Sequence, residues 1–186
     1  MARAARALFV GRFQPFHQGH RAIVDHLLKQ EVNGQPIRGV VIGIGSSQVS
    51  HTLHDPMTAG ERHEVVTASV HDLIDKGIDI SILPIPDLNH HSLWVSHVVA
   101  LCPRFSLVFT NTRLDRTLFL EAGYPVADSY YLRREVLSAT SIRQRMTEGQ
   151  GWEELVMPAA VPLLEELGIP QRLKDLLSTE GEGRSS

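Results

Sequence analysis

The chain has 186 residues, of which 42% are hydrophobic, and its formal net charge is −3. This length suits a single domain with an ample core, and the slightly acidic charge argues against a general nucleic-acid-binding surface. No apolar run approaches a membrane span of about eighteen residues, and the single cysteine, Cys102, excludes an internal disulfide framework. We therefore expect a cytoplasmic protein that binds neither nucleic acid nor membrane.

The first informative stretch is residues 7–28, ALFVGRFQPFHQGHRAIVDHLL. It predicts a buried strand at 7–10, and apolar residues at helical spacing follow Arg21. In the turn between them, Gly11 and Gly19 would let the backbone approach a ligand closely. The start of the helix offers free N–H groups and a partial positive charge, which suit a phosphate group.

Three side chains of this turn can bind an anion. His17 and His20 are three residues apart, so at the start of a helix both rings point the same way. Arg12 adds a permanent cation with a planar fork of donors. Together they predict a site that clamps a polyphosphate without a covalent step. Zinc is another reading of the two histidines, but no cysteine pair or further ligand is nearby, and we assign no metal ion to protein side chains.

A second strand and helix follow this turn. Residues 33–36 have turn chemistry, and residues 37–45, IRGVVIGIG, read as a buried strand. Thr58 and Glu61 have the spacing of a capping box, so a helix should begin there. Gly77 should end it.

The remainder continues this alternation of strands and helices. Further strands are predicted at 78–85, 105–109 and 125–127, with helices at 92–101 and 114–121. After a polar, irregular stretch at 128–137, Ser138 or Thr140 should cap another helix. Residues 152–177 read as helical with breaks at Pro158 and 168–170, and the tail, 179–186, is expected to be disordered.

This order predicts an α/β fold, a Rossmann-like doubly wound parallel sheet with helices on both faces and a helical C-terminal end. We expect one domain over residues 1–178, with its C-terminal helical part at 138–178. Each polar loop follows a strand: these loops are 11–20, 45–58, 86–91 and 110–113. Because ligands of such sheets bind at the carboxyl ends of the strands, the loops should meet in one site.

Several motifs resemble one family. His17-Gln18-Gly19-His20 is similar to the H-x-G-H signature of the nucleotidylyltransferase superfamily, and the longer GRFQPFHQGH resembles the archaeal-type nicotinamide-nucleotide adenylyltransferases. SSQVSH with DPMTAGER, PIPD with SLWVSHV, and SATSIRQRM resemble further blocks of that family, in its order. The resemblance implies transfer of AMP from ATP to nicotinamide mononucleotide, with NAD and pyrophosphate as products. It also implies a requirement for Mg²⁺ and a homo-oligomer, since relatives tend to form hexamers.

The resemblance assigns roles to individual residues. The implied catalytic residues are His17, His20, Arg12 and Arg143, and the implied ATP-binding set adds Gly11, Phe13, Gly19, Thr140, Ser141 and Ile142. The implied mononucleotide-binding residues are Gly45, Ser46, Ser47, His54, Asp87, Trp94 and Asn111. Trp94 would stack on nicotinamide, or else it is a core residue. Asp87 could accept a hydrogen bond from the substrate or only close a turn, and Arg62 could be a solvated helix charge.

The chain departs from the family at four places. His54 stands where members usually carry an Arg, and His91 stands where an Asn is common. Asn111-Thr112 replaces a usual Gly-Asn, and Ala139 replaces a Gly. Other readings therefore stay open: an adenylyltransferase for nicotinate mononucleotide or phosphopantetheine, or a catalytically silent nucleotide-binding regulator. A dinucleotide-dependent dehydrogenase is disfavoured because no G-x-G-x-x-G follows the first strand.

Overall fold

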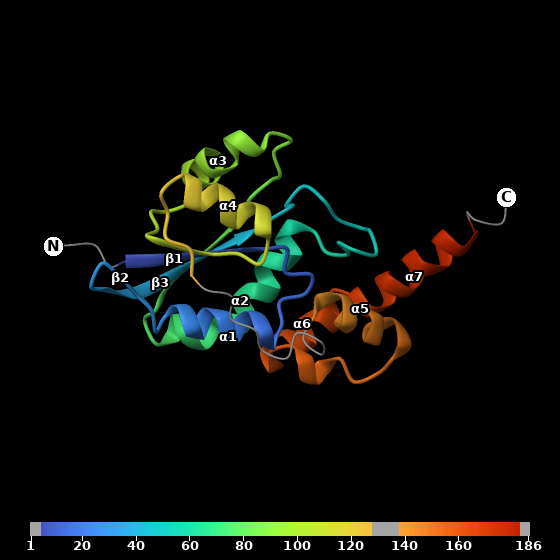
Figure 1. The fold of residues 1–186 in the computed structure, drawn as a ribbon. Helices are drawn as coiled ribbons and strands as arrows, with labels where there is room; N and C mark the ends of the chain where they lie inside the picture. Colours follow the sequence, from blue (N-terminus) through green and yellow to red (C-terminus); the bar gives the residue numbers. More distant parts are fainter. Residues whose placement is uncertain (1–4, 128–137, 183–186) are drawn as a thin grey trace.

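The fold is built on a mostly parallel sheet whose two faces are both covered by helices (Figure 1). The computed structural model describes residues 5–127 and 138–182. The parallel strands are β1 (Ala5–Gly11), β3 (Gln35–Ile44), β4 (Asp79–Pro84) and β5 (Leu107–Phe109), in the spatial order β4-β3-β1-β5. The short β2 (Glu31–Val32) pairs antiparallel with the beginning of β3.

The central strand β1 explains why the sheet is buried on both sides. Its side chains alternate between two apolar cores: Ala7 and Phe9 belong to one, and Leu8 and Val10 belong to the other. Strands covered on both faces read as continuous apolar runs rather than as alternating ones. This is why the sequence run that ends at Val10 predicted a buried strand correctly.

The helices are divided between the two faces as predicted. In Figure 1, α1 (Gln18–Leu27) and α2 (Ala59–Asp75) lie below the sheet, while α3 (Trp94–Leu101) and α4 (Arg113–Glu121) lie above it. The chain passes from β4 on one side of β1 to β5 on the other. The loops that leave β1 and β5 therefore diverge at the switch point of the sheet, where ligands of this architecture bind.

The C-terminal part is helical, as expected. It consists of α5 (Ala139–Glu148), α6 (Val161–Glu166) and α7 (Ile169–Glu182), together with two short 3₁₀ turns at Glu153–Leu155 and Pro158–Ala160. A further 3₁₀ turn, His91–Leu93, leads into α3. Since α7 continues to Glu182, residues 179–182 of the expected tail are helical.

Local signals in the sequence were mostly accurate. Thr58 and Glu61 form the predicted capping box of α2, and Gly77 follows that helix with a φ of +78°. Ser138, rather than Thr140, caps α5. In the described residues, the strand predicted at 125–127 is reduced to an isolated parallel bridge between Val126 and Val108 of β5.

Two further expectations concern segments between these elements. Of the predicted turn at 33–36, residues 33 and 34 connect β2 and β3, with φ angles of +52° and +73°, whereas residues 35 and 36 already belong to β3. Asn-Gly at two positive φ angles is the usual two-residue hairpin turn. The irregular stretch predicted at 128–137 lies outside the described residues.

Candidate active site

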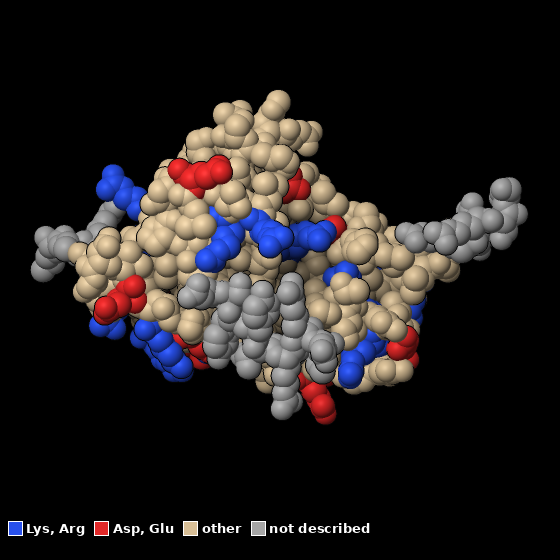
Figure 2. All heavy atoms as spheres, in the orientation of Figure 1, with Lys and Arg blue, Asp and Glu red and all other residues tan. Residues whose placement is uncertain are grey.

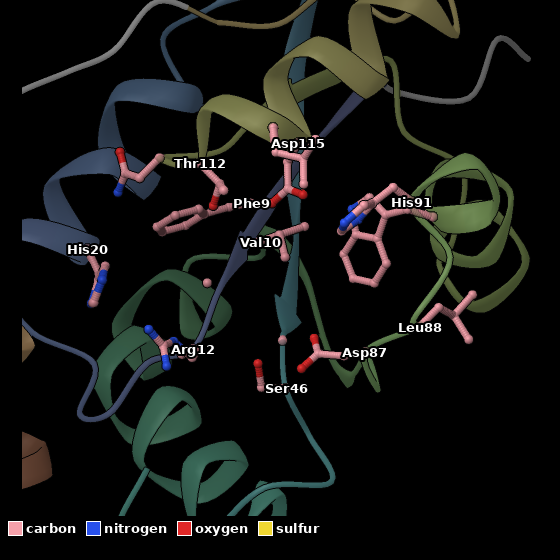
Figure 3. A pocket seen from close by; sticks show the side chains of 15 residues that line it. Phe9, Val10, Arg12, His20, Ser46, Asp87, Leu88, His91, Thr112 and Asp115 are labelled. Atoms are coloured by element: carbon pink, nitrogen blue, oxygen red, sulfur yellow. The ribbon is translucent and has the colours of Figure 1, made fainter. Parts of the chain in front are cut away.

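A pocket of about 430 Å³ opens at the carboxyl ends of the strands (Figure 3). Its lining consists of Phe9, Val10, Gly11, Arg12, His20, Gly45, Ser46, Asp87, Leu88, His91, Trp94, Asn111, Thr112, Leu114 and Asp115. These residues come from the end of β1, from the segments that follow each of the four parallel strands, and from the first turns of α1, α3 and α4. The predicted meeting of the four loops in one site is therefore confirmed.

His17 and His20 form a reciprocal cap at the start of α1. The Nδ1 atom of His17 accepts a hydrogen bond from the backbone N–H of His20 at 3.4 Å, and Nδ1 of His20 accepts one from the N–H of His17 at 3.3 Å. The rings are stacked with centroids 3.6 Å apart. Because each Nδ1 acts as an acceptor, a neutral ring carries its proton on Nε2.

The neutral form of both rings is favoured by their surroundings. Burial lowers the pKa of His17 to about 4. Burial also lowers the pKa of His20 well below its ordinary value, and the neighbouring His17 lowers it further. Near neutral pH the pair therefore provides two uncharged Nε2–H donors. His20 lines the pocket, and His17, whose ring is stacked on it, is 6% exposed.

Phe13, Gly11 and Gly19 of this turn are involved in packing. Phe13 is buried in the core, and its ring contacts Phe9 edge-to-face. A Cβ atom at Gly11 would lie 2.9 Å from the Phe13 ring, and Gly19 is buried in α1. A side chain at Gly11 would therefore meet the Phe13 ring, and the backbone of Gly11 lines the pocket.

Arg12 and Arg62 have opposite environments. The Arg12 side chain is 59% exposed at the pocket, with Nη1 3.5 Å from Oδ2 of Asp55. Arg62 is fully buried, so the reading of a solvated helix charge was wrong. Its guanidinium donates to five backbone carbonyls, those of Arg12, Gly45, Ser46, Val49 and Thr58. Arg62 therefore joins the loop after β1 to the loop after β3.

Arg143 is also buried and bonded to backbone. Its guanidinium donates to the carbonyls of Leu53 and Gln14, at 2.9 and 2.8 Å, and to the hydroxyl of Thr140. Arg143, Thr140 and His54 line a neighbouring cavity of about 370 Å³. His54, expected among the mononucleotide-binding residues, lies outside the lining of the first pocket. The bond from Arg143 to the carbonyl of Leu53 joins its loop to α5.

The cap of α5 occupies some of the expected phosphate donors. The hydroxyl of Ser138 accepts the N–H of Ser141, and the carbonyl of Ser138 accepts the N–H of Ile142. The Ile142 side chain is in the core. Ser47 is likewise outside the pocket lining, with its N–H bonded to the carbonyl of Ile85.

The pocket lining also contains Trp94, Asp87 and Asn111, three of the residues expected to bind the mononucleotide. The side chain of Gln48 makes two hydrogen bonds to Asp87. Its Nε2 donates to Oδ2 of Asp87 at 3.2 Å, and its Oε1 accepts the backbone N–H of Asp87 at 3.0 Å. Trp94 is 9% exposed. Trp94 belongs to the core beneath α3, as one of the two readings had it, and it also lines the pocket. Its stacking on nicotinamide stays a prediction.

Sequence reasoning missed Asp115, which lines the pocket from the first turn of α4. Burial raises the pKa of Asp115, with a smaller contribution from Asp87, although hydrogen bonds from Thr112 and Thr110 and the charge of His91 act the other way. The polar loop noted in the sequence ended at residue 113. An acidic residue in the first turn of the next helix was the signal that could have identified it.

Basic side chains are concentrated on the surface of one face of the molecule. Figure 2 shows basic side chains gathered in a band across the middle of one face, over the region where β1 ends and α4 begins in Figure 1.

Within residues 5–127 and 138–182, no group of three or more His, Cys, Asp or Glu side chains could hold a metal ion. No helix in the described part is long and apolar enough to cross a membrane.

Comparison with known proteins gives consistent matches. The cytidylyltransferase-like family model matches residues 8–145. The nicotinamide-nucleotide adenylyltransferase of Picrophilus torridus is 43% identical over 94% of this chain and 99% of its own length. The corresponding protein of Thermococcus sibiricus is 42% identical over 95% of this chain and 91% of its own length.

Among solved structures, a bifunctional NMN adenylyltransferase/ADP ribose pyrophosphatase from Francisella tularensis, complexed with AMP and a manganese ion, matches with a TM-score of 0.68. It is 19% identical, and the match covers 97% of this chain but only 54% of that one. This chain therefore spans about half the length of that protein, and the likeness establishes a shared fold.

Proposed function

Because the chain belongs to the cytidylyltransferase-like family, and within it to the nicotinamide-nucleotide adenylyltransferases, we propose that it transfers AMP from ATP to nicotinamide mononucleotide, forming NAD and pyrophosphate. One observation carries this proposal: the same pocket is lined by Arg12 and His20 and by Trp94. The first two suit phosphate groups, and the third suits a flat, cationic ring.

The reaction is a displacement at phosphorus. A 5′-phosphate oxygen of the mononucleotide forms a bond to the α-phosphorus of ATP, and the bond from that phosphorus to the bridging oxygen of the β-phosphate breaks, which releases pyrophosphate. Such a step needs positioning and charge neutralisation more than acid–base groups. The Nε2–H groups of His17 and His20 are suited to it as donors to phosphate oxygens.

In this proposal the buried arginines, Arg62 and Arg143, position the loops that form the site. Arg62 joins the loops after β1 and β3 through their carbonyls, and Arg143 joins Gln14 to Leu53. Their positive charges lie close to the basic end of the pocket, since both are coupled to Asp55 and Arg12. We infer that Arg143 acts on the triphosphate mainly through its positive charge and by positioning the loops that contain Gln14 and Leu53.

We assign a divalent ion, Mg²⁺, to the ATP phosphates rather than to a protein cluster. The pocket contains two carboxylates, Asp87 after β4 and Asp115 at the start of α4, and they come from different elements (Figure 3). An ion bound to the triphosphate would neutralise part of its charge. The Nε2–H groups of the two histidines and Arg12 would donate hydrogen bonds to the phosphate oxygens that the ion does not bind.

The experiment is pyrophosphate release by the purified protein with ATP and Mg²⁺. It is run with nicotinamide mononucleotide, nicotinate mononucleotide, phosphopantetheine and no acceptor. Release that requires a pyridine mononucleotide supports the proposal. Release only with phosphopantetheine would assign another acceptor, and no release with any of them would favour a silent nucleotide-binding regulator.

A further inference from the structure

We propose that Asp55 competes with the triphosphate for Arg12, and so limits how tightly the pocket holds ATP and pyrophosphate. Asp55 lies outside the lining of the pocket, which Arg12 forms in part. It is therefore a positioning residue, because it acts through Arg12 and not by touching the substrate. The inference rests on the proposed adenylyl transfer for the identity of the polyphosphate.

Asp55 carries a buried carboxylate on a turn that the fold holds in place. Its side chain is 8% exposed. The backbone N–H of Asp55 donates to the hydroxyl of Thr52 at 2.9 Å, and its carbonyl accepts the N–H of Thr52 at 3.2 Å. Just after the turn, the side chain of Gln14 makes two hydrogen bonds of 3.0 Å to the backbone of Met57. The position of the carboxylate is therefore set by backbone contacts on both sides of it.

The two oxygens of this carboxylate are poorly satisfied by hydrogen bonds. Oδ1 is buried and has no hydrogen-bond partner within the part of the chain that the structure describes. Oδ2 lies 3.5 Å from Nη1 of Arg12, which is at the limit of a hydrogen bond. Because a buried carboxylate is unfavourable without a compensating cation, Asp55 depends on the charge of the arginines around it.

Three guanidinium groups are coupled to this carboxylate. Burial lowers the pKa of Arg62 and of Arg143, whereas the charge of Asp55 raises both values and the charge of Arg12 lowers both. Asp87 also raises the pKa of Arg62, to a smaller extent. Arg62 and Arg143 are bonded to backbone carbonyls, but the side chain of Arg12 is 59% exposed. Of these three arginines, Arg12 is the one that can leave Asp55 for a ligand.

The contact between Asp55 and Arg12 favours competition with a ligand over orientation of Arg12 for it. A carboxylate that fixes the plane of a guanidinium group does so through two short, parallel hydrogen bonds. The single contact of 3.5 Å does not fix that plane, whereas Coulomb attraction is still strong at this distance in a partly buried site. A polyphosphate that binds Arg12 must overcome this attraction, so removing the carboxylate should tighten polyphosphate binding.

The test is the affinity for pyrophosphate with Mg²⁺, measured by calorimetric titration without any acceptor. Asp55→Asn removes the charge and keeps the shape, Asp55→Ser removes the charge with a smaller side chain, and Asp55→Glu keeps the charge. Asp79→Asn is the matched control, since Asp79 pairs with Arg6 near the beginning of β1, at the end of that strand away from the pocket. The titrations of Asp55→Asn are repeated in an Arg12→Met background, and urea unfolding verifies that each variant is folded.

We expect both charge-removing variants of Asp55 to bind pyrophosphate about tenfold more tightly than the wild type. The KM for ATP should fall by a similar factor while kcat changes less than about threefold, because the added binding is uniform. Asp55→Glu and Asp79→Asn should stay within about threefold of the wild type, and the gain from Asp55→Asn should fall below about threefold in the Arg12→Met background.

Unchanged or weaker pyrophosphate binding in both charge-removing variants would overturn the inference, as would a tenfold gain that persists with Arg12→Met. Tightening of the same size in Asp55→Glu would make shape the cause, which also overturns it. If no NAD is formed but the gain appears and depends on Arg12, the proposed reaction fails and the role of Asp55 stands. If NAD is formed and the gain is absent, the reaction stands and this inference fails.

Discussion

At the scale of single residues, the site depends on groups whose protonation and position are set by their own neighbours. His17 and His20 cap the helix that presents them, and the same hydrogen bonds leave their Nε2–H groups available as donors. Arg62 and Arg143 use their donors on backbone carbonyls far away in the sequence. Two predictions follow from these environments.

The first prediction concerns stability against pH at His17. Burial lowers the pKa of His17 from 6.5 to about 4, so unfolded chains take up the proton first as the pH falls. The stability due to neutral His17 should be present above pH 6.5 and lost progressively toward pH 4, by about 3 kcal/mol if the full shift applies. Urea unfolding at pH 7.5 and 4.5 measures it.

The control for His17 is His17→Asn, since Asn also caps helices well. This variant should lose less stability than the wild type between the two pH values. Equal losses in both proteins would show that His17 is not the group responsible.

The second prediction concerns Arg62. Arg62→Met removes the donors to the carbonyls of Arg12, Gly45 and Ser46, and each buried group left unsatisfied costs about 1–3 kcal/mol. We expect a loss of about 3 kcal/mol or more in the free energy of unfolding, with partial recovery in Arg62→Lys. A urea midpoint unchanged in Arg62→Met would contradict the structural role given to this side chain.

At the scale of elements, the strand, turn and helix over residues 7–28 could be predicted because their signals are local: an apolar run, glycines and helical spacing. The convergence of the loops could also be predicted, since it follows from parallel strand order. The partners of Arg62 and Arg143 could not, because Arg143 contacts Gln14, which is 129 residues away in the chain. Asp115 was missed because its role depends on which way the first turn of α4 faces.

A prediction at this scale concerns the attachment of α7. Arg172 donates to both carboxylate oxygens of Glu61, at 2.7 and 2.8 Å, and to the carbonyl of Pro56 at 2.9 Å. Arg172→Met should lower the free energy of unfolding by about 1–3 kcal/mol because a half-buried, bidentate pair is lost. Thermal unfolding measures it against Lys174→Met, an exposed position on α7, and equal midpoints for the two variants would rule out this role.

At the scale of the whole molecule, several large apolar side chains are exposed on the layer formed by α3 and α4. Leu93, Val99 and Leu101 near α3 and Leu120 on α4 are all between 42 and 54% exposed. Large exposed apolar patches usually mark an interaction surface. The family resemblance implies a homo-oligomer, and this layer is where we expect its contacts.

The prediction at this scale concerns the oligomeric state. Sedimentation of the wild type should give an oligomer, and Leu101→Lys combined with Leu120→Lys should shift it to smaller species because two charges would be buried in the contact. Leu177→Lys, at an exposed position of α7, serves as the control. A monomeric wild type, or an oligomer unaffected by the double change, would contradict this assignment.

The central claim is that the histidine pair beside Arg12 serves adenylyl transfer to a mononucleotide. Its most direct test is the rate of NAD formation from ATP and nicotinamide mononucleotide in the wild type, in His20→Ala and in His63→Ala, an exposed histidine of α2. We predict that His20→Ala lowers kcat at least about a hundredfold while His63→Ala stays within about twofold of wild type. A His20→Ala enzyme that keeps its rate, or a wild type that forms no NAD, would contradict the account.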